Sequence, residues 1–249
     1  MRPPQHIFDE SPLVAGLLSE VLEAVLDRAK PGVTTLDLAD ACAEEIAKRS
    51  LSPAMPGLNN YPSAACVSID EQVLHAIPSS RRKIKSGDLV TVQSAVRGRS
   101  AYANLGWTRL VGPGKEARAG FVAHIRDVLS EVVGILKPTD RVGDLGSAIQ
   151  ERVEAEGYSV VREYCGYGMV EQMFCEPQLV CYGQRSAGPQ FEVGSVLNIH
   201  VIATAGTPHV NLGRDGWTVS TRDRKDAAMF NAMVRVHQDS VELISRLLD

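Results

Sequence analysis

The chain has 249 residues, of which 44% are hydrophobic, and its 26 basic and 30 acidic side chains leave a net charge of −4. This composition is typical of a globular protein with a sizeable core, and the absence of a long Lys/Arg run argues against nucleic acid as a partner. No apolar stretch approaches the roughly 20 residues of a membrane helix, and residues 1–14 lack the apolar core of a signal peptide, so we expect a soluble cytoplasmic protein without membrane contact.

Two helices are predicted at the start of the chain. Residues 11–29 carry apolar side chains at helical spacing, and a second helix follows Lys30, where Thr34 is a suitable N-cap. The β-branched stretches that come next predict strands. These lie at residues 64–69, 88–96 and 107–111.

The second part of the chain shows the same order of elements. Residues 120–136 form another amphipathic stretch, and a helix that Asp140 can cap follows Lys137. β-Branched stretches again predict strands. These lie at residues 158–164, 195–203, 216–221 and 229–236.

The two parts are related by an internal repeat. The segments KPGVTTLDLADACAEEI, from Lys30, and KPTDRVGDLGSAIQERV, from Lys137, share Lys, Pro, Asp, Leu, Ala and Glu at one constant offset. A duplicated α-α-β unit packs most simply as two related halves, about residues 10–112 and 117–245, within one domain spanning residues 1–249. Such packing leaves a cleft at the pseudo-twofold axis, where a ligand would bind.

Several segments resemble type I methionine aminopeptidases, in family order over residues 13–245. They are KPGVTTLDL, NNYPSAACVSIDEQVLHAIP, GDLVTVQSAV, VVREYCGYGMV, CEPQLVCYG, FEVGSVLNIH and DGWTVSTRDRKDAAMF. The resemblance implies an α+β pita-bread fold, with two pseudo-twofold α-α-β halves whose curved antiparallel sheets are covered by helices. It agrees with the repeat, which is observed independently.

The resemblance also implies a pair of divalent metal ions held by two aspartates, a histidine and two glutamates, a donor set able to generate a hydroxide nucleophile. In this chain none of the corresponding positions keeps its family residue. They are occupied by Gln93, Asn104, Tyr167, His200 and Asn231. We therefore expect no metal, no cofactor and no dimetal aminopeptidase activity.

A substrate pocket is implied by other positions. His75, Cys66 and Trp217 match residues that line the methionine pocket of the family, and Leu58 stands where a tyrosine is expected. The family histidine that contacts the substrate amide falls on Phe174 or Cys175. Together with the amides Gln93, Asn104 and Asn231, these residues are our predicted substrate-binding set.

Each candidate catalytic residue has two interpretations. His200 is either a general acid or base or a histidine satisfied by neighbouring amides. Tyr167 either donates to a developing oxyanion or only packs in a glycine-flanked turn, and for His75 a ligand contact is expected. Cys165, Cys175 and Cys181 are either small residues that fill a strand and turn or include a nucleophile.

Two functional hypotheses follow from these residues. The first is a metal-independent enzyme of specialised metabolism in which His200, Tyr167 and His75 perform hydrolysis, cyclisation, isomerisation or elimination on a small amino-acid-derived or peptide-like substrate. The second is a non-catalytic peptide- or ligand-binding pseudo-peptidase. In either case the partner is a small molecule or peptide, and the protein is a monomer or homodimer.

Overall fold

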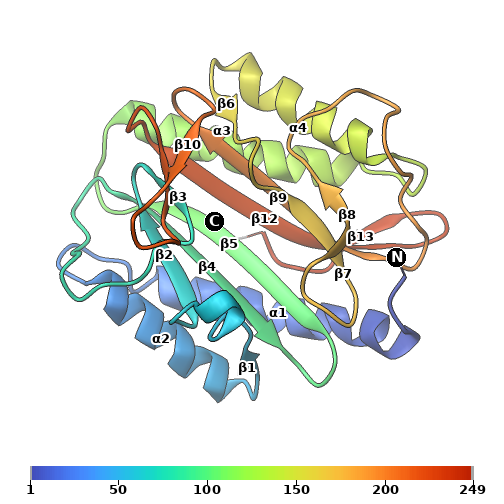
Figure 1. Cartoon of the computed structure of the whole chain (residues 1–249), viewed down its shortest axis with the longest axis horizontal. Helices are drawn as coiled ribbons and strands as arrows, with labels where there is room; N and C mark the ends of the chain where they lie inside the picture. Colours follow the sequence, from blue (N-terminus) through green and yellow to red (C-terminus); the bar gives the residue numbers. More distant parts are fainter. Residues whose placement is uncertain (1, 248–249) are drawn as a thin grey trace.

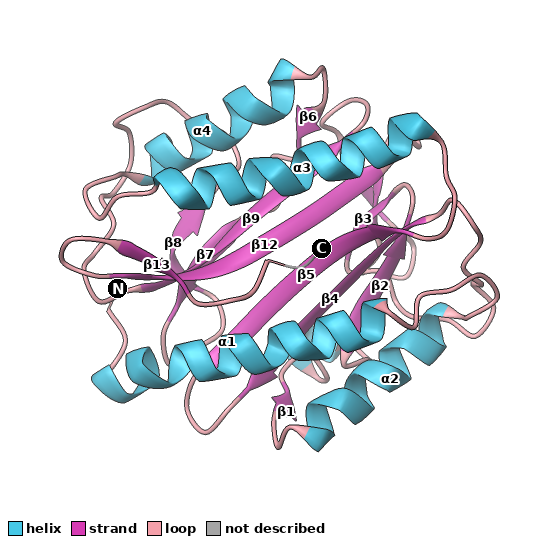
Figure 2. Ribbon diagram, turned by 180° about the vertical axis from the view of Figure 1, so that it is seen from behind, coloured by secondary structure: helices cyan, strands magenta, loops and turns pink. Residues whose placement is uncertain are grey.

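The computed structural model describes residues 2–247. Its long helices all lie on one face of the strands (Figures 1 and 2). Within residues 2–247, no helix combines the length and the apolar character needed to cross a bilayer. The helices are α1 (Gln5–Leu26), α2 (Thr35–Lys48), α3 (Glu116–Ile135) and α4 (Val142–Ala155), with a short 3-10 turn, η1 (Leu58–Asn60).

The strands form one main sheet in each part of the chain, and a third, smaller sheet joins strands from both parts. In the first part they are β1 (Ser52–Pro53), β2 (Ala65–Ile69), β3 (Gln72–Leu74), β4 (Leu89–Arg97) and β5 (Tyr102–Leu110). In the second part they are β6 (Ser159–Val160), β7 (Gly166–Met169), β8 (Cys175–Leu179), β9 (Val196–Thr204), β10 (Val210–Leu212), β11 (Val219–Thr221), β12 (Ala227–Val236) and β13 (Val241–Leu243).

The two main sheets have the same arrangement, which confirms the predicted pseudo-twofold halves. In the first, β4 pairs antiparallel with β1 and β2 along one edge and with β5 along the other. In the second, β9 pairs with β6 and β7 along one edge and with β12 along the other. The halves meet where β5 and β12 lie side by side (Figure 1).

Strand register brings the predicted site residues to this junction. Gln93 of β4 lies opposite Gly106 of β5, and Asn231 of β12 lies opposite His200 of β9. In addition, Tyr167 of β7 lies opposite Asn198 of β9. Residues far apart in the chain therefore converge on one place between the half-sheets.

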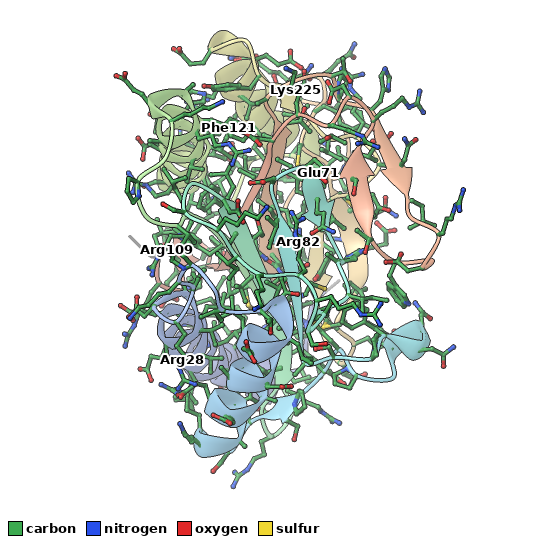
Figure 3. The ribbon with its side chains drawn as sticks, turned by 90° about the vertical axis from the view of Figure 1, so that its left-hand side faces the viewer. Arg28, Glu71, Arg82, Arg109, Phe121 and Lys225 are labelled. Atoms are coloured by element: carbon green, nitrogen blue, oxygen red, sulfur yellow. The ribbon has the colours of Figure 1, made fainter. Side chains whose placement is uncertain are left out.

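The core fills the layer between the helices and the sheets. Leu18 and Leu22 are buried on one side of α1, while Phe121 and Ile125 are buried on one side of α3, as helical periodicity requires. Figure 3 shows Phe121 on the side of α3 that faces the strands. These apolar stripes hold the two helical pairs against the sheets and leave the opposite sheet face free for a pocket.

The predicted N-caps have different outcomes. Thr34 caps α2 as expected: its Oγ1 accepts the N–H of Asp37 at 3.1 Å, and the Asp37 carboxylate accepts the Thr34 N–H at 2.8 Å. The prediction for Asp140 is wrong, because its carboxylate accepts the Lys137 N–H at 2.8 Å and α4 begins only at Val142. A bond within the preceding loop occupies the side chain that the sequence suggested as a cap.

Strand boundaries were the least accurate part of the sequence interpretation. Of residues 158–164, only Ser159 and Val160 form a strand. The CGYGM segment is strand β7 rather than a turn. Its glycines are explained by close packing, because a Cβ on Gly166 would meet the backbone of Asn198, and one on Gly168 would meet the backbone of Glu176.

Candidate ligand pocket

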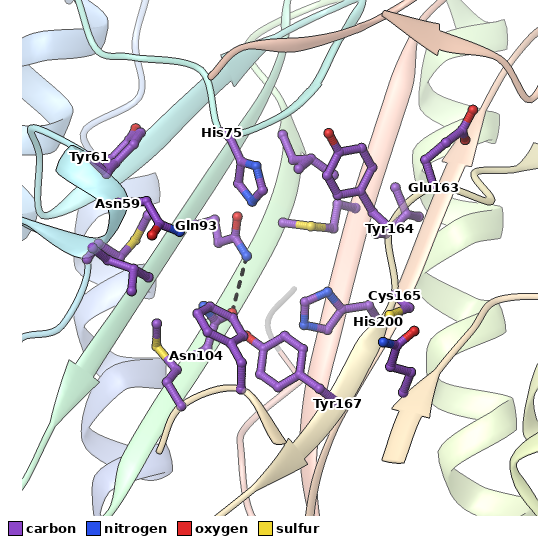
Figure 4. Close-up of a pocket in the computed structure, with 18 of the residues that line it drawn as sticks. Asn59, Tyr61, His75, Gln93, Asn104, Glu163, Tyr164, Cys165, Tyr167 and His200 are labelled. Atoms are coloured by element: carbon purple, nitrogen blue, oxygen red, sulfur yellow. Dashed lines mark hydrogen bonds between the residues drawn. The ribbon is translucent and has the colours of Figure 1, made fainter. Parts of the chain in front are cut away.

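A pocket of about 600 Å³ lies between the half-sheets, and Figure 4 shows its interior. No residue of α1 to α4 lines it, so it opens on the sheet face away from the helices. The lining residues are Met55, Leu58, Asn59, Tyr61, Leu74, His75, Gln93, Asn104, Glu163, Tyr164, Cys165, Tyr167, Met173, Phe174, Cys175, Glu176, Gln178, His200, Ile202, Trp217 and Met229.

The pocket has a floor, by which we mean the hydrogen-bond network of Gln93, Asn104, Asn198 and His200 around Asn231. Asn231 Oδ1 accepts the backbone N–H of Gly106, which orients the amide. The Nδ2 atom then lies 3.2 Å from Asn104 Oδ1, Asn104 O and Asn198 Oδ1, and 3.1 Å from His200 Nε2. One amide nitrogen is thus surrounded by acceptors from both half-sheets.

Gln93 continues this network. Asn104 Oδ1, which accepts from Asn231 Nδ2, also accepts from Gln93 Nε2 at 3.2 Å (Figure 4). The other atom of the Gln93 amide, Oε1, is buried and has no hydrogen-bond partner among residues 2–247. A buried polar atom without a partner costs roughly 1–3 kcal/mol, and here it belongs to a pocket-lining side chain.

His200 is a neutral histidine in this setting. Its side chain is buried, and its Nε2 faces the Asn231 amide nitrogen, which is a donor, so the ring proton belongs on Nδ1. Burial, together with the neighbouring His75, lowers the pKa of His200 to about 3. The imidazole therefore stays uncharged at neutral pH.

His75 reaches the pocket from a strained position. It follows β3 with φ at 57°, in the left-handed region that non-glycine residues rarely adopt. Pairing of β3 with β11 brings it near Trp217, and its ring centroid lies 5.6 Å from that of Tyr164 and 6.2 Å from that of Trp217. Burial lowers the pKa of His75 to about 4.

Tyr167 is buried on the side of the pocket opposite His75 (Figure 4). Its ring centroid lies 4.6 Å from that of Phe174 and 5.3 Å from that of His200. Burial raises the pKa of Tyr167, so the phenol keeps its proton. The hydroxyl has no hydrogen-bond partner within the described part of the chain.

An aromatic wall forms a further side of the pocket. Tyr61 and Trp217 meet edge to face, with ring centroids 5.0 Å apart. The Tyr61 hydroxyl donates to Ala76 O at 2.9 Å, and the backbone N–H of Trp217 donates to Asp215 Oδ1 at 3.0 Å. These bonds hold both residues at one end of the pocket.

The structure brings the predicted site residues together, and all but two of them line the pocket. His75, Leu58, Gln93, Asn104, Tyr167, Phe174, Cys175, His200 and Trp217 line the pocket. Cys66 lies beside Gln93, its partner in the β2–β4 register, and is buried. Asn231 belongs to the floor through its bonds with the lining residues Asn104 and His200, without facing the open space itself.

Some contributors were missed by the sequence interpretation. Asn198 is fully buried and donates to Asn104 O at 3.0 Å. Its position two residues before His200 in a strand was a usable signal, because alternate residues share one face. Tyr61, Tyr164 and the exposed Glu163 also line the pocket, and no periodic pattern marks them.

The three clustered cysteines occupy different environments. Cys181 is buried and its thiol donates to His200 O at 3.2 Å, whereas Cys165 and Cys175 are half-buried at the pocket. Burial raises the pKa of Cys181 to about 12 and also raises that of Cys165. Neither thiol readily forms the thiolate that a nucleophile requires near neutral pH.

Comparison with known proteins identifies the family. Residues 14–238 match the metallopeptidase family M24. The chain belongs to this family. The M24 chain is 32% identical over 247 residues to the methionine aminopeptidase of Escherichia coli (strain K12), a match covering 98% of this chain and 93% of that protein. It is 31% identical to methionine aminopeptidase B of Synechocystis sp., covering 96% and 89%.

Solved structures give the same relationship. The methionine aminopeptidase of Thermotoga maritima superimposes on the M24 protein with a TM-score of 0.96 at 28% identity, covering 99% of both chains. That of Rickettsia prowazekii gives a TM-score of 0.95 at 28% identity, again over 99% of both. The predicted pita-bread fold and the resemblance to type I methionine aminopeptidases are therefore confirmed.

The hypothesis of a metal-independent enzyme of specialised metabolism is wrong. Relatives named methionine aminopeptidases match nearly the whole chain, in sequence and in structure, and point to a peptidase. That hypothesis assigned proton transfer to His200 and Tyr167. In this structure both are buried, and burial favours their uncharged forms.

Proposed function

We propose that this M24 protein binds the amino-terminal residue of a peptide in the pocket between its half-sheets. The observation that carries the proposal is a pocket of about 600 Å³ with an aromatic wall at one end and a polar floor beside it. An aromatic wall suits an apolar side chain, and a hydrogen-bonding floor suits backbone atoms. Relatives named methionine aminopeptidases support this substrate class.

We propose ligand contacts on three sides of the pocket. Leu58 and Trp217 would pack on the side chain, since both line the pocket, and His75 borders the end that holds Trp217. Gln93 and Tyr167 present polar atoms that lack partners among residues 2–247. We propose these residues as ligand contacts. Of the residues predicted to be catalytic, His200 supports the floor through its bond with Asn231.

We further infer that the floor does not hold the metal pair that the resemblance implies, so that the chain is not a functional dimetal aminopeptidase. Within residues 2–247, no three or more His, Cys, Asp or Glu side chains are grouped so that they could hold a metal ion. The only carboxylates lining the pocket from this range, Glu163 and Glu176, are exposed. Amides carry no charge to offset that of divalent cations.

The amide network supports this inference independently. Acceptors that a cation would need are turned toward Asn231 Nδ2, which lies within 3.2 Å of oxygens from Asn104 and Asn198 and 3.1 Å from His200 Nε2. The two hydrogens of this neutral amide are shared among these acceptors, which are thus bonded without a metal. The floor is held together by its own hydrogen bonds.

The test combines calorimetry and metal analysis. The purified protein is titrated with the tripeptide Met-Ala-Ser and with its N-acetylated form, and bound manganese, iron, cobalt and zinc are measured by mass spectrometry. We expect saturable binding of at least one peptide and far less than one metal ion per chain. If neither peptide binds, the proposed function is wrong. Stoichiometric metal together with release of methionine from Met-Ala-Ser would overturn the inference about the metal pair.

A further inference from the structure

The orientation of one floor amide follows from a single backbone group. The N–H of Gly106 can only donate, so the atom of Asn231 that receives it is Oδ1 and the atom facing Asn104 is Nδ2. Asn104 therefore presents Oδ1, and Gln93 donates to it through Nε2. The atom of Gln93 left without a partner is consequently an acceptor, Oε1.

The hydroxyl of Tyr167 is a donor that complements the acceptor Gln93 Oε1. Tyr167 and Gln93 both line the pocket, and their labelled side chains lie around the same central space in Figure 4. The phenol of Tyr167 is a donor without a partner in the described chain, and Gln93 Oε1 is an acceptor in the same state. The pair offers one site for an N–H and one for a carbonyl oxygen.

The floor carries no charge to balance a cation. The lining residues include no Lys, Arg or Asp, and the carboxylates of Glu163 and Glu176 are exposed. A free peptide amino terminus is an ammonium at neutral pH, and an ammonium buried without a counter-charge is strongly disfavoured. An uncharged amide at the same place meets no such penalty.

On the basis of the peptide binding proposed above, we infer that the pocket selects a blocked amino terminus, an N-acyl amide, over a free ammonium. The amide N–H of the blocked residue donates to Gln93 Oε1, and the acyl carbonyl oxygen accepts from the Tyr167 hydroxyl. The side chain of that residue packs against Trp217 and Tyr61, whose rings form the aromatic wall.

Calorimetric titration tests the selection directly. N-Acetyl-Met-Ala-Ser is compared with Met-Ala-Ser at pH 7 and at pH 9.5, above the pKa of about 8 of a free α-amino group. We expect the acetylated peptide to bind at least about tenfold more tightly at pH 7 and the difference to shrink at pH 9.5, because the free amine becomes neutral. Equal or tighter binding of Met-Ala-Ser at pH 7 would overturn the inference while leaving peptide binding intact.

A third ligand, N-acetylmethionine, distinguishes recognition of the N-acyl amide alone from recognition of an N-acylated peptide. If N-acetylmethionine alone binds as tightly as the acetylated peptide, recognition of the N-acyl amide stands and the peptide part of the proposed function fails. If the acetylated peptide binds much more tightly, both stand. Binding of none of the three ligands contradicts both proposals.

Single substitutions test whether Gln93 and Tyr167 cause the preference for a blocked amino terminus. Gln93→Glu is isosteric; it removes the N–H that donates to Asn104 Oδ1 and adds a carboxylate beside the bound terminus. We expect the preference to shift toward Met-Ala-Ser by about tenfold or more. Gln190→Glu adds the same charge at an exposed position outside the pocket and should not shift the preference. Tyr167→Phe removes only the hydroxyl and should weaken the acetylated peptide selectively. An unchanged preference in both the Gln93→Glu and Tyr167→Phe variants, with folding verified by circular dichroism, would overturn the inference.

Discussion

Asn231 of β12 donates to Asn104 of β5, with 3.2 Å between Asn231 Nδ2 and Asn104 Oδ1. These strands belong to different sheets of the described chain, so the bond joins the two halves through side chains. Thr108 extends the junction, since its Oγ1 donates to Met229 O at 3.0 Å and accepts the Met229 N–H at 2.9 Å. The same amides form the pocket floor and the contact between half-sheets.

Replacing Asn231 by alanine should therefore destabilise the whole fold. The change leaves the buried Gly106 N–H without its side-chain acceptor and removes one donor from each Asn104 oxygen, which keeps its bond from Asn198 or Gln93. We expect the free energy of unfolding to fall by about 2–3 kcal/mol. Urea denaturation followed by circular dichroism measures this loss. Asn211→Ala, on the exposed strand β10, is the control and should change stability by less than about 0.5 kcal/mol. Equal effects of both substitutions would show that the junction does not depend on this amide.

Restoring the family donors should create a metal site. A variant carrying all five family residues gains the charged oxygens that divalent ions require, and we expect it to bind manganese or cobalt more tightly than the natural chain. Its substitutions are Gln93→Asp, Asn104→Asp, Tyr167→His, His200→Glu and Asn231→Glu.

Metal content and thermal unfolding provide the measurement for this variant. Added metal should raise its melting temperature in a concentration-dependent way, because a ligand that binds only the folded state stabilises it. The matched control keeps Asn104 and Asn231 as amides and should show little shift. A similar shift for the natural chain would contradict the inferred absence of a metal pair.

His200 makes stability depend on pH in a defined window. Its pKa is about 3 in the folded protein, against 6.5 for the unperturbed group, so the unfolded chain binds a proton that the folded chain excludes. The stabilising contribution is complete above pH 6.5 and is lost as the pH falls toward 3. At about 1.4 kcal/mol per pH unit, the loss from His200 alone amounts to roughly 2–3 kcal/mol between pH 6.5 and 4.5.

The variant His200→Gln tests this dependence. It keeps an acceptor near Asn231 and removes the titration, so its unfolding free energy should fall less steeply between pH 6.5 and 4.5. Urea midpoints measured across this range give the slopes. His209→Gln is the matched control, because His209 is exposed and should leave the slope unchanged. If His200→Gln and the natural chain have the same slope, the histidine is not excluded from protonation in the folded state.

The sequence predicted the fold and most of the pocket because both depend on repeated or alternating patterns. The duplicated segments at Lys30 and Lys137 indicated two halves, and the resemblance to type I methionine aminopeptidases singled out Gln93 and His200. Asn198 lies on the same strand face as His200 and was overlooked. Tyr61 and Tyr164 reach the pocket from irregular segments, which carry no periodicity to read.

The role of a residue depends on its environment, which the sequence does not specify. His200 and Tyr167 line one pocket, but the sequence does not reveal how completely they are buried. Asp140 illustrates the same limit at a helix end, where a competing loop bond with Lys137 decides the outcome. Burial and competition between partners are tertiary properties.

Asp215 should control ligand affinity without contacting the ligand. It lies outside the pocket lining, and its carboxylate accepts the Trp217 N–H at 3.0 Å, the Thr218 N–H at 2.9 Å and the Thr218 hydroxyl at 2.6 Å. Removing these bonds in Asp215→Ala frees the hairpin that carries Trp217, so we expect peptide affinity to fall about tenfold, or about 1.4 kcal/mol. Asp215→Asn keeps an acceptor and should restore most of the affinity in calorimetric titrations. Asp239→Ala, at an exposed position, should have no effect, and equal affinity for Asp215→Ala and the natural chain would show that Trp217 needs no such support.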